Sequence, residues 1–349
     1  MAEHPDVALT LPAPRAAAQI SLQLLDAARA ASGRLADTSD AEALHDFRVG
    51  LRRLRSTFRS FRDDLDDVVP KKLRNRLRDL TRTTSSARDA EVLIAWIERH
   101  LAELAAGKRA GISWFVARLR EERDRAYGEI RRDVPPRFIR LERRLRKALA
   151  VAAKTRAARP DAPSLATRAA GLAAEHAAVL EQELGAIQSA RDENTTHAAR
   201  ITAKRLRYLL EPLAAPEARA VLARLKDLQT LLGDLHDLHV LAEQLAEAVG
   251  DAAAARARRQ HEISLNGPAA VRGKRGPRPA TSGLIALAQL VHRAQDDAFR
   301  TFSEEWRGKA DAELWAALAA LTSALTAPVV PIPIRPPSRI RRAPRSVVT

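Results

Sequence analysis

An arginine-rich helical segment occurs twice in this chain, and this repeat limits the possible folds more than any other feature. The first copy reads HDFRVGLRRLRSTFRSFR over residues 45–62, and the second reads HAARITAKRLRYLLE over residues 197–211. On a helix that turns about 100° per residue, the cations of each copy fall on one side and the large apolar residues gather on another. Each copy is therefore predicted to bury an apolar face while it displays a cationic stripe.

Each cationic stripe begins with a histidine. The members of the first stripe lie within about 80° of one another around the helix. They are His45, Arg48, Arg52, Arg55 and Arg59, and the corresponding members of the second stripe are His197, Arg200, Lys204 and Arg207. The apolar sides are formed by Leu51, Leu54 and Phe58 in the first copy and by Leu206, Leu209 and Leu210 in the second.

Two further motifs recur behind the stripes in the same order. LRDL at residues 77–80 corresponds to LKDL at residues 225–228, and RDAEVL at residues 88–93 corresponds to HDLHVL at residues 236–241. The members of each pair are separated by about 150 residues, which predicts an internal duplication. We therefore expect two similar helical units, related by approximate two-fold symmetry, whose stripes face one site.

The rest of the sequence has helical periodicity and no convincing run of alternating strand residues. With 349 residues, of which 46% are hydrophobic, the chain can fill two cores without metal or disulfide support, and it has no cysteine. We predict an all-α protein built as a pair of helical bundles. Expected helices cover about residues 15–35, 45–65, 71–82, 88–104, 112–132, 137–153, 164–189, 197–211, 221–232, 235–263 and 284–325.

Proline, glycine and arginine content marks the segments between these units. We predict a flexible N-terminus over residues 1–14, a first helical half over 15–154, a linker over 155–163 and a second helical half over 164–326. The second half contains a flexible basic insertion at residues 265–283, and a disordered tail rich in proline and arginine covers residues 327–349. The cations of the insertion and the tail have no acids beside them.

The formal net charge of +16 predicts an anionic partner, which includes nucleic acid, acidic lipid and other polyanions. A planar guanidinium group matches the oxygens of a phosphate, and a row of them one or two helical turns apart suits a repeating anion. Aromatic residues make up only 4% of the chain, which disfavours recognition of single-stranded nucleic acid by base stacking. A general nucleic-acid-binding protein remains the first alternative.

A metal-dependent phosphohydrolase is the second alternative. His236, Asp237 and His239 have the side chains of a metal site, but only Asp237 has a matching residue in the first half, Asp89. An aspartate shared by two such copies more often caps a helix or pairs with a cation. No glycine-rich phosphate loop and no serine nucleophile motif is present. We therefore expect a protein without enzymatic activity, metal or cofactor.

The chain lacks the sequence pattern of a leader or of a membrane span. Its first residues do not place a basic start before an apolar run, and no later segment approaches the roughly 18 uncharged apolar residues that a membrane span requires. We expect a cytoplasmic protein.

Two residues of the repeated helices depart from the pattern. Tyr208 lies near the basic side of the second copy, but the first copy has Ser56 in its place, so we predict a structural role for the tyrosine. Gly50 lies inside the first copy, where glycine costs about 1 kcal/mol relative to alanine. Close helix packing or the approach of a ligand would explain it.

The repeated motifs resemble those of the CHAD family, the conserved histidine α-helical domain. The resemblance is carried by HDFRVGLRRLRSTFRSF in the first half and by HAARITAKRLRYLLE and LKDLQTLLGDLHDLHVL in the second, and it covers most of the chain. It implies two pseudo-symmetric helical bundles around a basic central cavity, binding of inorganic polyphosphate and association with polyphosphate granules. Some relatives also carry a triphosphate-cleaving CYTH domain, which is not visible in this sequence.

The resemblance also implies which residues bind polyphosphate. They are His45, Arg48, Arg52, Arg53, Arg55, Arg59, Arg74, Arg78, His197, Arg200, Lys204, Arg205, Arg207 and Lys226. The basic insertion and the tail depart from the family pattern and leave open a second contact with nucleic acid, an acidic surface or another protein.

Overall fold

The computed structural model describes residues 8–37, 39–40, 42–154, 161–213, 215–267 and 281–327. Within these ranges every regular element is a helix, and extended backbone pairs in one isolated bridge between Pro12 and Ser164. The all-α prediction is therefore confirmed. None of the described helices combines the length and hydropathy of a membrane-spanning helix.

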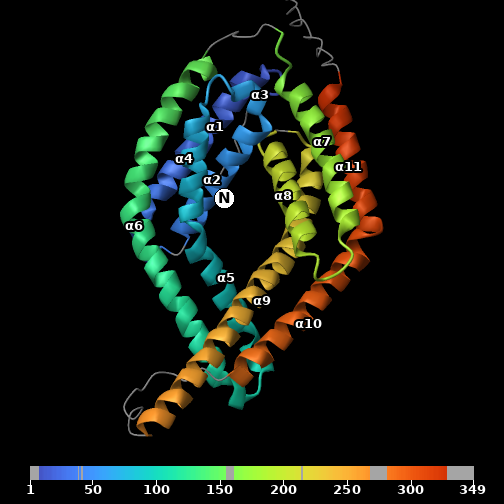
Figure 1. Cartoon of the computed structure of the whole chain (residues 1–349). Helices are drawn as coiled ribbons and strands as arrows, with labels where there is room; N and C mark the ends of the chain where they lie inside the picture. Colours follow the sequence, from blue (N-terminus) through green and yellow to red (C-terminus); the bar gives the residue numbers. More distant parts are fainter. Residues whose placement is uncertain are drawn as a thin grey trace, which may run out of the picture.

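The helices of the first half of the chain lie on one side of the molecule in Figure 1, opposite α7, α8 and α11 of the second half. The first half contains α1 (Ala13–Arg34), α2 (Ala43–Ser60), α3 (Arg62–Leu65), α4 (Lys71–Thr83), α5 (Ser85–His100), two short 3₁₀ turns (Leu101–Glu103 and Ala106–Lys108) and α6 (Arg109–Lys154). The second half contains α7 (Leu165–Ala186), α8 (Glu193–Leu210), α9 (Ala218–Asn266), α10 (Thr281–Trp306) and α11 (Lys309–Thr326). The internal duplication and a central cavity between equivalent bundles stay predictions.

The apolar face of α2 is buried as its periodicity predicts. Asp40 precedes this helix, and its carboxylate accepts hydrogen bonds from the backbone N–H groups of Glu42 and Ala43 at 3.1 and 3.0 Å, which caps the helix start. Phe47 packs edge-on against Phe138 of α6, with ring centroids 5.1 Å apart. With one face fixed in the core, the cations on the other side of α2 are held in a defined direction.

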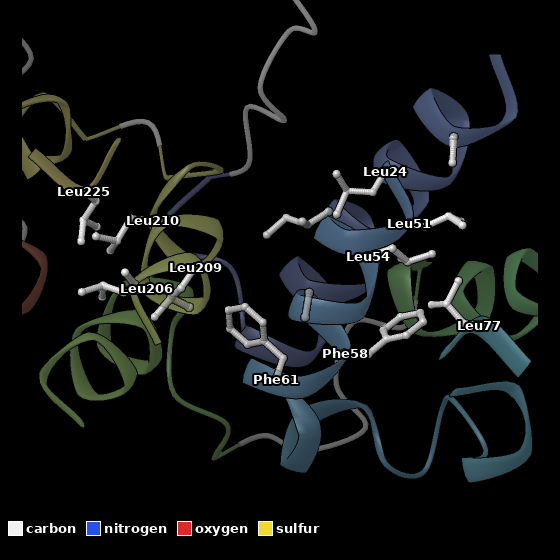
Figure 2. Close-up of a cluster of buried hydrophobic side chains, with 14 of the residues drawn as sticks. Leu24, Leu51, Leu54, Phe58, Phe61, Leu77, Leu206, Leu209, Leu210 and Leu225 are labelled. Atoms are coloured by element: carbon white, nitrogen blue, oxygen red, sulfur yellow. The ribbon is translucent and has the colours of Figure 1, made fainter. Parts of the chain in front are cut away.

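One large core includes apolar residues from both halves of the chain. Figure 2 shows Leu51 and Leu54 of α2 within it, with Phe58 beside Leu77 of α4. The same cluster contains the apolar face of α8, formed by Leu206, Leu209 and Leu210. The two repeated helices are therefore anchored in one continuous core.

A second core joins the halves at the other end of the molecule. It is formed by α5 and the start of α6 from the first half and by α9 and α10 from the second, which converge at the lower end of Figure 1. Ile97 and Phe115 contribute from the first half, and Leu241 and Leu287 contribute from the second. The halves therefore share this core.

Two expected helix breaks are wrong, because α6 and α9 run without interruption through the proline pair at residues 135–136 and through Gly233. A proline inside a helix costs about 3 kcal/mol or more, and a glycine costs about 1 kcal/mol. Burial of each large apolar side chain contributes about 1.5 to 3 kcal/mol, and buried residues continue on both sides of each break. They are Ile130, Val134, Phe138 and Leu141 in α6 and Leu228, Leu232, Leu235 and Leu238 in α9.

Two helices expected to be continuous are instead divided. The helix that carries the first stripe ends at Ser60, because Phe61 leaves helical geometry with φ −98° and ψ 38°, and the short α3 follows. The expected helix over residues 284–325 is divided into α10 and α11 at residues 307–308. In both places the chain turns while its apolar residues remain buried, as Phe61 and Trp306 do.

The segments predicted to be flexible fall largely outside the described residues, which exclude residues 1–7, 155–160, 268–280 and 328–349. The described part of the predicted N-terminal segment is held in place. The carbonyl oxygens of Leu9 and Leu11 accept hydrogen bonds from the backbone N–H groups of Ala166 and Leu165 at 3.0 and 2.7 Å. This contact ties the start of the chain to the start of α7.

Gly50 lies where α1 and α2 approach most closely. A Cβ atom built on this glycine would be 3.1 Å from the Cβ of Ala28 and 3.3 Å from its Cα. The backbone of α1 therefore occupies the space that a side chain would need. Of the two explanations that the sequence allowed, close helix packing is confirmed.

Candidate anion-binding site

A pocket of about 510 Å³ opens between α2, α4 and α8. Its lining contains lysine and arginine side chains from both halves of the chain and no aspartate or glutamate. The cations are Arg52, Arg55, Arg59, Arg62, Lys71, Arg74, Arg78, Lys204 and Arg205. Seven of the residues predicted to bind polyphosphate are therefore brought together.

Helical periodicity explains how α2, α4 and α8 place most of these cations around one pocket. Arg52, Arg55 and Arg59 are about one turn apart on α2, on the side away from the buried leucines. On α4, Lys71, Arg74 and Arg78 share a face by the same spacing, while Leu73, Leu77 and Leu80 are buried. α8 completes the wall with Lys204 and Arg205.

Some pocket cations form ion pairs, and others form none among the described residues. Arg74 forms an ion pair with Asp66, and the Nε atom of Arg78 lies 3.7 Å from a carboxylate oxygen of Asp79. Within the described part of the chain, no ion pair is formed by Arg52, Arg55, Arg59, Lys204 or Arg205. These cations line one pocket and repel one another, so an anion bound there would offset the repulsion between them.

The pKa of Lys204 reflects this repulsion. Burial first, and then the charges of Arg200 and Arg52, lower it from 10.5 to about 6. Burial, followed by the charge of Arg59, also lowers the pKa of Arg205. Arginine remains charged at neutral pH despite such shifts, whereas Lys204 loses most of its charge when the pocket is empty.

Buried donors without partners point into this region. The Nε atoms of Arg52 and Arg205 and the hydroxyl of Ser56 are buried and have no hydrogen-bond partner among the described residues. Native proteins satisfy the large majority of such groups, so each unsatisfied donor calls for an explanation. All three residues line the pocket.

Tyr208 has the structural role that the sequence predicts, and it also lines the pocket. The guanidinium carbon of Arg52 lies 5.8 Å from the centroid of its ring, and that of Arg207 lies 5.3 Å away. Cations at such distances are attracted to the ring. The tyrosine is only 6% exposed, so it supports arginines of both halves and offers no open face for stacking.

Arg48 and Arg200 do not line the pocket. Arg48 donates a hydrogen bond to the carbonyl oxygen of Thr84 and lies 3.9 Å from Asp89. Its pKa is lowered, and burial is the largest cause. Arg200 is similarly affected by burial, and its most favourable charge partner is Asp237. The expectation that the shared aspartate pairs with a cation is thus confirmed for Asp89.

The two stripe histidines, His45 and His197, do not line the pocket and are mostly uncharged near neutral pH. Burial is the first cause that lowers the pKa of His45 and of His197, followed by the charges of Arg88 and Arg200 respectively. The ring of His197 lies 4.8 Å from that of His236, whose pKa burial lowers to about 3. These histidines can therefore act as hydrogen-bond donors, and they add no positive charge.

The residues on α9 that carried the metal alternative are not arranged as a metal site. The Nε2 atom of His239 is buried and hydrogen-bonds with the backbone carbonyl of Ala190 at 2.7 Å, which indicates a structural role. Among the residues that the structure describes, no group of three or more histidine, aspartate or glutamate side chains could hold a metal ion.

Besides Arg48, Arg200 and the two stripe histidines, three more predicted phosphate ligands lie outside the pocket. Arg53 and Arg207 both contact Glu211, at 2.9 and 2.8 Å, and Lys226 is exposed on α9. Sequence analysis in turn missed Arg62, Lys71 and Asn75, which line the pocket. Lys71 and Asn75 could have been found, because they lie three residues before Arg74 and Arg78 on the same helical face.

The sequence model of the CHAD domain matches residues 18–246, which is more than half of the chain. The chain belongs to the CHAD family. The matched residues include both cationic stripes and every residue that lines the pocket between α2, α4 and α8. Family membership therefore applies to the part of the chain that contains the candidate site.

Two solved structures resemble this CHAD protein. The crystal structure of the CHAD domain from the plant Ricinus communis has a TM-score of 0.60 and 23% sequence identity, over 91% of this chain and 96% of that one. PptA from Streptomyces chartreusis has a TM-score of 0.49 and 19% identity, over 85% of this chain and 98% of that one. No curated protein sequence matches the chain. The likeness to the Ricinus structure supports the helical fold.

Proposed function

We propose that this CHAD protein binds inorganic polyphosphate, without cleaving it, in the pocket between α2, α4 and α8. The observation that carries the proposal is the set of pocket cations without ion pairs, contributed by α2 and α8 from different halves of the chain. Polyphosphate is a linear anion with a charge on every unit, so one chain can neutralise several of these groups at once. Forked guanidinium donors match its oxygens.

The magnitude of such contacts is sufficient for tight binding. A charge-assisted hydrogen bond contributes about 1.5 to 3 kcal/mol, so four contacts would supply about 6 to 12 kcal/mol before the cost of ordering the chain. A dissociation constant of about 1 μM requires about 8 kcal/mol. The fixed helices lower the ordering cost on the protein side, because Arg52 and Lys204 are already directed at the pocket.

The pocket favours a bare phosphate chain over nucleic acid. Its aromatic residues are Phe58 and Tyr208, which are 3% and 6% exposed and therefore provide no stacking platform for bases. Polyphosphate has no bases, so its binding requires no stacking platform. The arrangement suits recognition through phosphate oxygens alone.

Competition at fixed salt distinguishes these ligands. Labelled long-chain polyphosphate is bound to the full chain and challenged with unlabelled polyphosphate, single-stranded RNA or duplex DNA at equal phosphate concentration. Salt must be fixed because each phosphate contact adds to the salt dependence of binding. We expect unlabelled polyphosphate to displace the label and the nucleic acids to leave most of it bound. Stronger displacement by either nucleic acid would overturn the proposal.

The proposed lack of enzymatic activity has its own test. Phosphate release from polyphosphate is measured with added Mg²⁺, Mn²⁺ or Zn²⁺ for the wild type and for Asp237→Asn. We expect no release above the protein-free control. Metal-dependent release that disappears in Asp237→Asn would instead establish the phosphohydrolase alternative.

Association with polyphosphate granules follows from the same proposal. A fluorescent fusion of the full chain is expected to concentrate on granules and to disperse in cells that make no polyphosphate. A fusion that stays diffuse in cells with abundant granules would show that binding does not determine where the protein resides.

A further inference from the structure

A second basic pocket lies between α4 and α6, away from the lining of the first. It has a volume of about 360 Å³, and its floor includes Leu80 and Leu141, which belong to the core. Four arginines surround this floor, Arg76 from α4 and Arg137, Arg140 and Arg144 from α6. We call this pocket the outer groove.

Packing of the two helices brings these arginines together. Phe138, Leu141 and Leu145 of α6 are buried, which leaves residues 137, 140 and 144 on an adjoining face at the rim of the core. Burial of Leu77 and Leu80 places Arg76 at the rim from the side of α4. The convergence is fixed by the core and does not depend on the arginines themselves.

The protein balances only part of the charge of the outer groove. Its one lining carboxylate, Asp79, lies 3.7 Å from the Nε atom of Arg78 and 3.9 Å from Arg82. Asp133, one turn before Arg137, is paired with Arg132 at 2.9 Å. Within the described ranges, none of the four groove arginines forms an ion pair. The groove therefore has an excess of exposed positive charge that an anion would balance.

We infer that the outer groove is a second phosphate-binding site, which holds the part of a polyphosphate chain that extends beyond the pocket between α2, α4 and α8. The inference rests on the proposed function. The two sites share α4, which directs Lys71, Arg74 and Arg78 into the first pocket and Arg76 into the outer groove. Arg76 lies about 140 to 160° from these three residues around a helix about 10 to 12 Å wide, so a chain crosses from one face to the other over a single helix.

This arrangement separates ligands by length. A short phosphate chain fills the first pocket and ends there, whereas a long chain occupies both sites and gains the contacts of the outer groove. Tripolyphosphate therefore reports on the first pocket, and long-chain polyphosphate reports on both.

The test compares two variants that lose the same charge. The groove variant carries Arg137→Gln, Arg140→Gln and Arg144→Gln, which keep helix propensity while removing the cations. The control carries Arg256→Gln, Arg258→Gln and Arg259→Gln near the end of α9, which extends beyond the other helices at the lower end of Figure 1. Circular dichroism and thermal unfolding establish that both variants fold as the wild type does.

Affinities for tripolyphosphate and for long-chain polyphosphate are then measured over a range of salt concentrations. We expect the groove variant to bind long chains roughly tenfold more weakly at low salt, with the slope of log Kd against log salt reduced by about 2 to 3. Its affinity for tripolyphosphate should equal that of the wild type, and the control should match the wild type with both ligands. Arg76→Gln, on the opposite wall, should weaken long-chain binding in the same direction.

Wild-type affinity of the groove variant for long chains would overturn the inference while the proposed function stands. Equal losses for both ligands would also overturn it, because the outer groove would then not be a separate site. Failure of the wild type to bind either ligand would refute the proposed function and the inference with it.

Discussion

Arg53 of α2 and Glu211, which follows the end of α8, form an ion pair of 2.9 Å that links the two halves of the chain. The Nε atom of Arg207 donates to the same carboxylate at 2.8 Å, and a second nitrogen of Arg207 donates to Gln229 at 2.7 Å. The Glu211 side chain is 10% exposed. Arg53 and Arg207 are thus paired where the halves join, whereas Arg52, Arg55, Arg59, Lys204 and Arg205 line the pocket.

Removing the shared carboxylate should destabilise the fold. We expect Glu211→Gln to lower the free energy of unfolding by about 1 to 3 kcal/mol, because Arg53 and Arg207 remain partly buried without a counter-charge. Glu243→Gln, at an exposed position on α9, is the control and should change stability by less than about 0.5 kcal/mol. Urea denaturation measures both. Equal stability of the two variants would show that the ion pair does not hold the halves together.

Polyphosphate binding should take up protons through Lys204. Its pKa is about 6 in the free protein, and a bound anion raises it. Affinity should therefore be highest below pH 6 and should weaken as the pH rises above that value. Calorimetry near pH 7.5 in buffers of different ionisation enthalpy should detect an uptake approaching one proton for the wild type.

Lys204→Arg supplies the control for that measurement, because arginine is charged in both states and cannot take up a proton. Long chains should be used, since only terminal phosphates titrate near neutral pH. A binding enthalpy of the wild type that does not depend on the buffer would contradict this account of Lys204.

Lys204 should lower the free energy of unfolding while it contributes to polyphosphate binding. Lys204→Met should raise the free energy of unfolding by about 1 to 2 kcal/mol at neutral pH and weaken polyphosphate binding. Burial, followed by the charges of Arg200 and Arg52, lowers the pKa from 10.5 to about 6 in the folded protein. The cost of Lys204 is therefore complete below pH 6 and disappears as the pH rises towards 10.5. The extra stability of Lys204→Met should therefore be largest below pH 6 and decline as the pH rises towards 10.5. A variant that is less stable than the wild type at pH 6 would show that burial of Lys204 carries no cost.

Substitution of two helical glycines should have opposite effects. Gly50→Ala places a Cβ atom 3.1 Å from the Cβ of Ala28, and overpacking of this kind costs about 1 to 3 kcal/mol. Gly171→Ala, on an exposed face of α7 with no atom within 4 Å, should stabilise the protein by up to about 1 kcal/mol. Thermal unfolding compares the two. A stabilised Gly50→Ala would show that α1 and α2 can move apart freely.

The sequence predicts elements whose signal is local. Periodicity over residues 45–60 indicates which side of α2 is buried, and the cations on the other side follow from it. It does not predict which of them meet a carboxylate, because Glu211 reaches Arg53 only after α2 and α8 have packed. Breaks within helices are hard to predict for a similar reason. The cost of the proline pair at residues 135–136 is visible in the local sequence, whereas the burial that offsets it depends on tertiary packing. The outer groove has no signal in either helix alone, because Arg76 and Arg137 belong to different helices.

The central claim is that the pocket between α2, α4 and α8 binds polyphosphate and that the basic tail does not. The affinity of long-chain polyphosphate at physiological salt is measured for the wild type, for a truncation that ends at Ala327 and for a pocket variant. The pocket variant carries Arg52→Gln, Arg55→Gln, Lys204→Gln and Arg205→Gln, cations without ion pairs, so their loss should not unfold the chain.

We expect the truncated protein to retain most of its affinity, because the sequence predicts no helix that would direct the tail cations, and their attraction for a ligand is screened over about 8 Å at this ionic strength. The pocket variant should lose at least about a hundredfold, which corresponds to about 2.7 kcal/mol. A pocket variant that binds like the wild type, together with a truncated protein that does not bind, would contradict the account and identify the tail as the binding element.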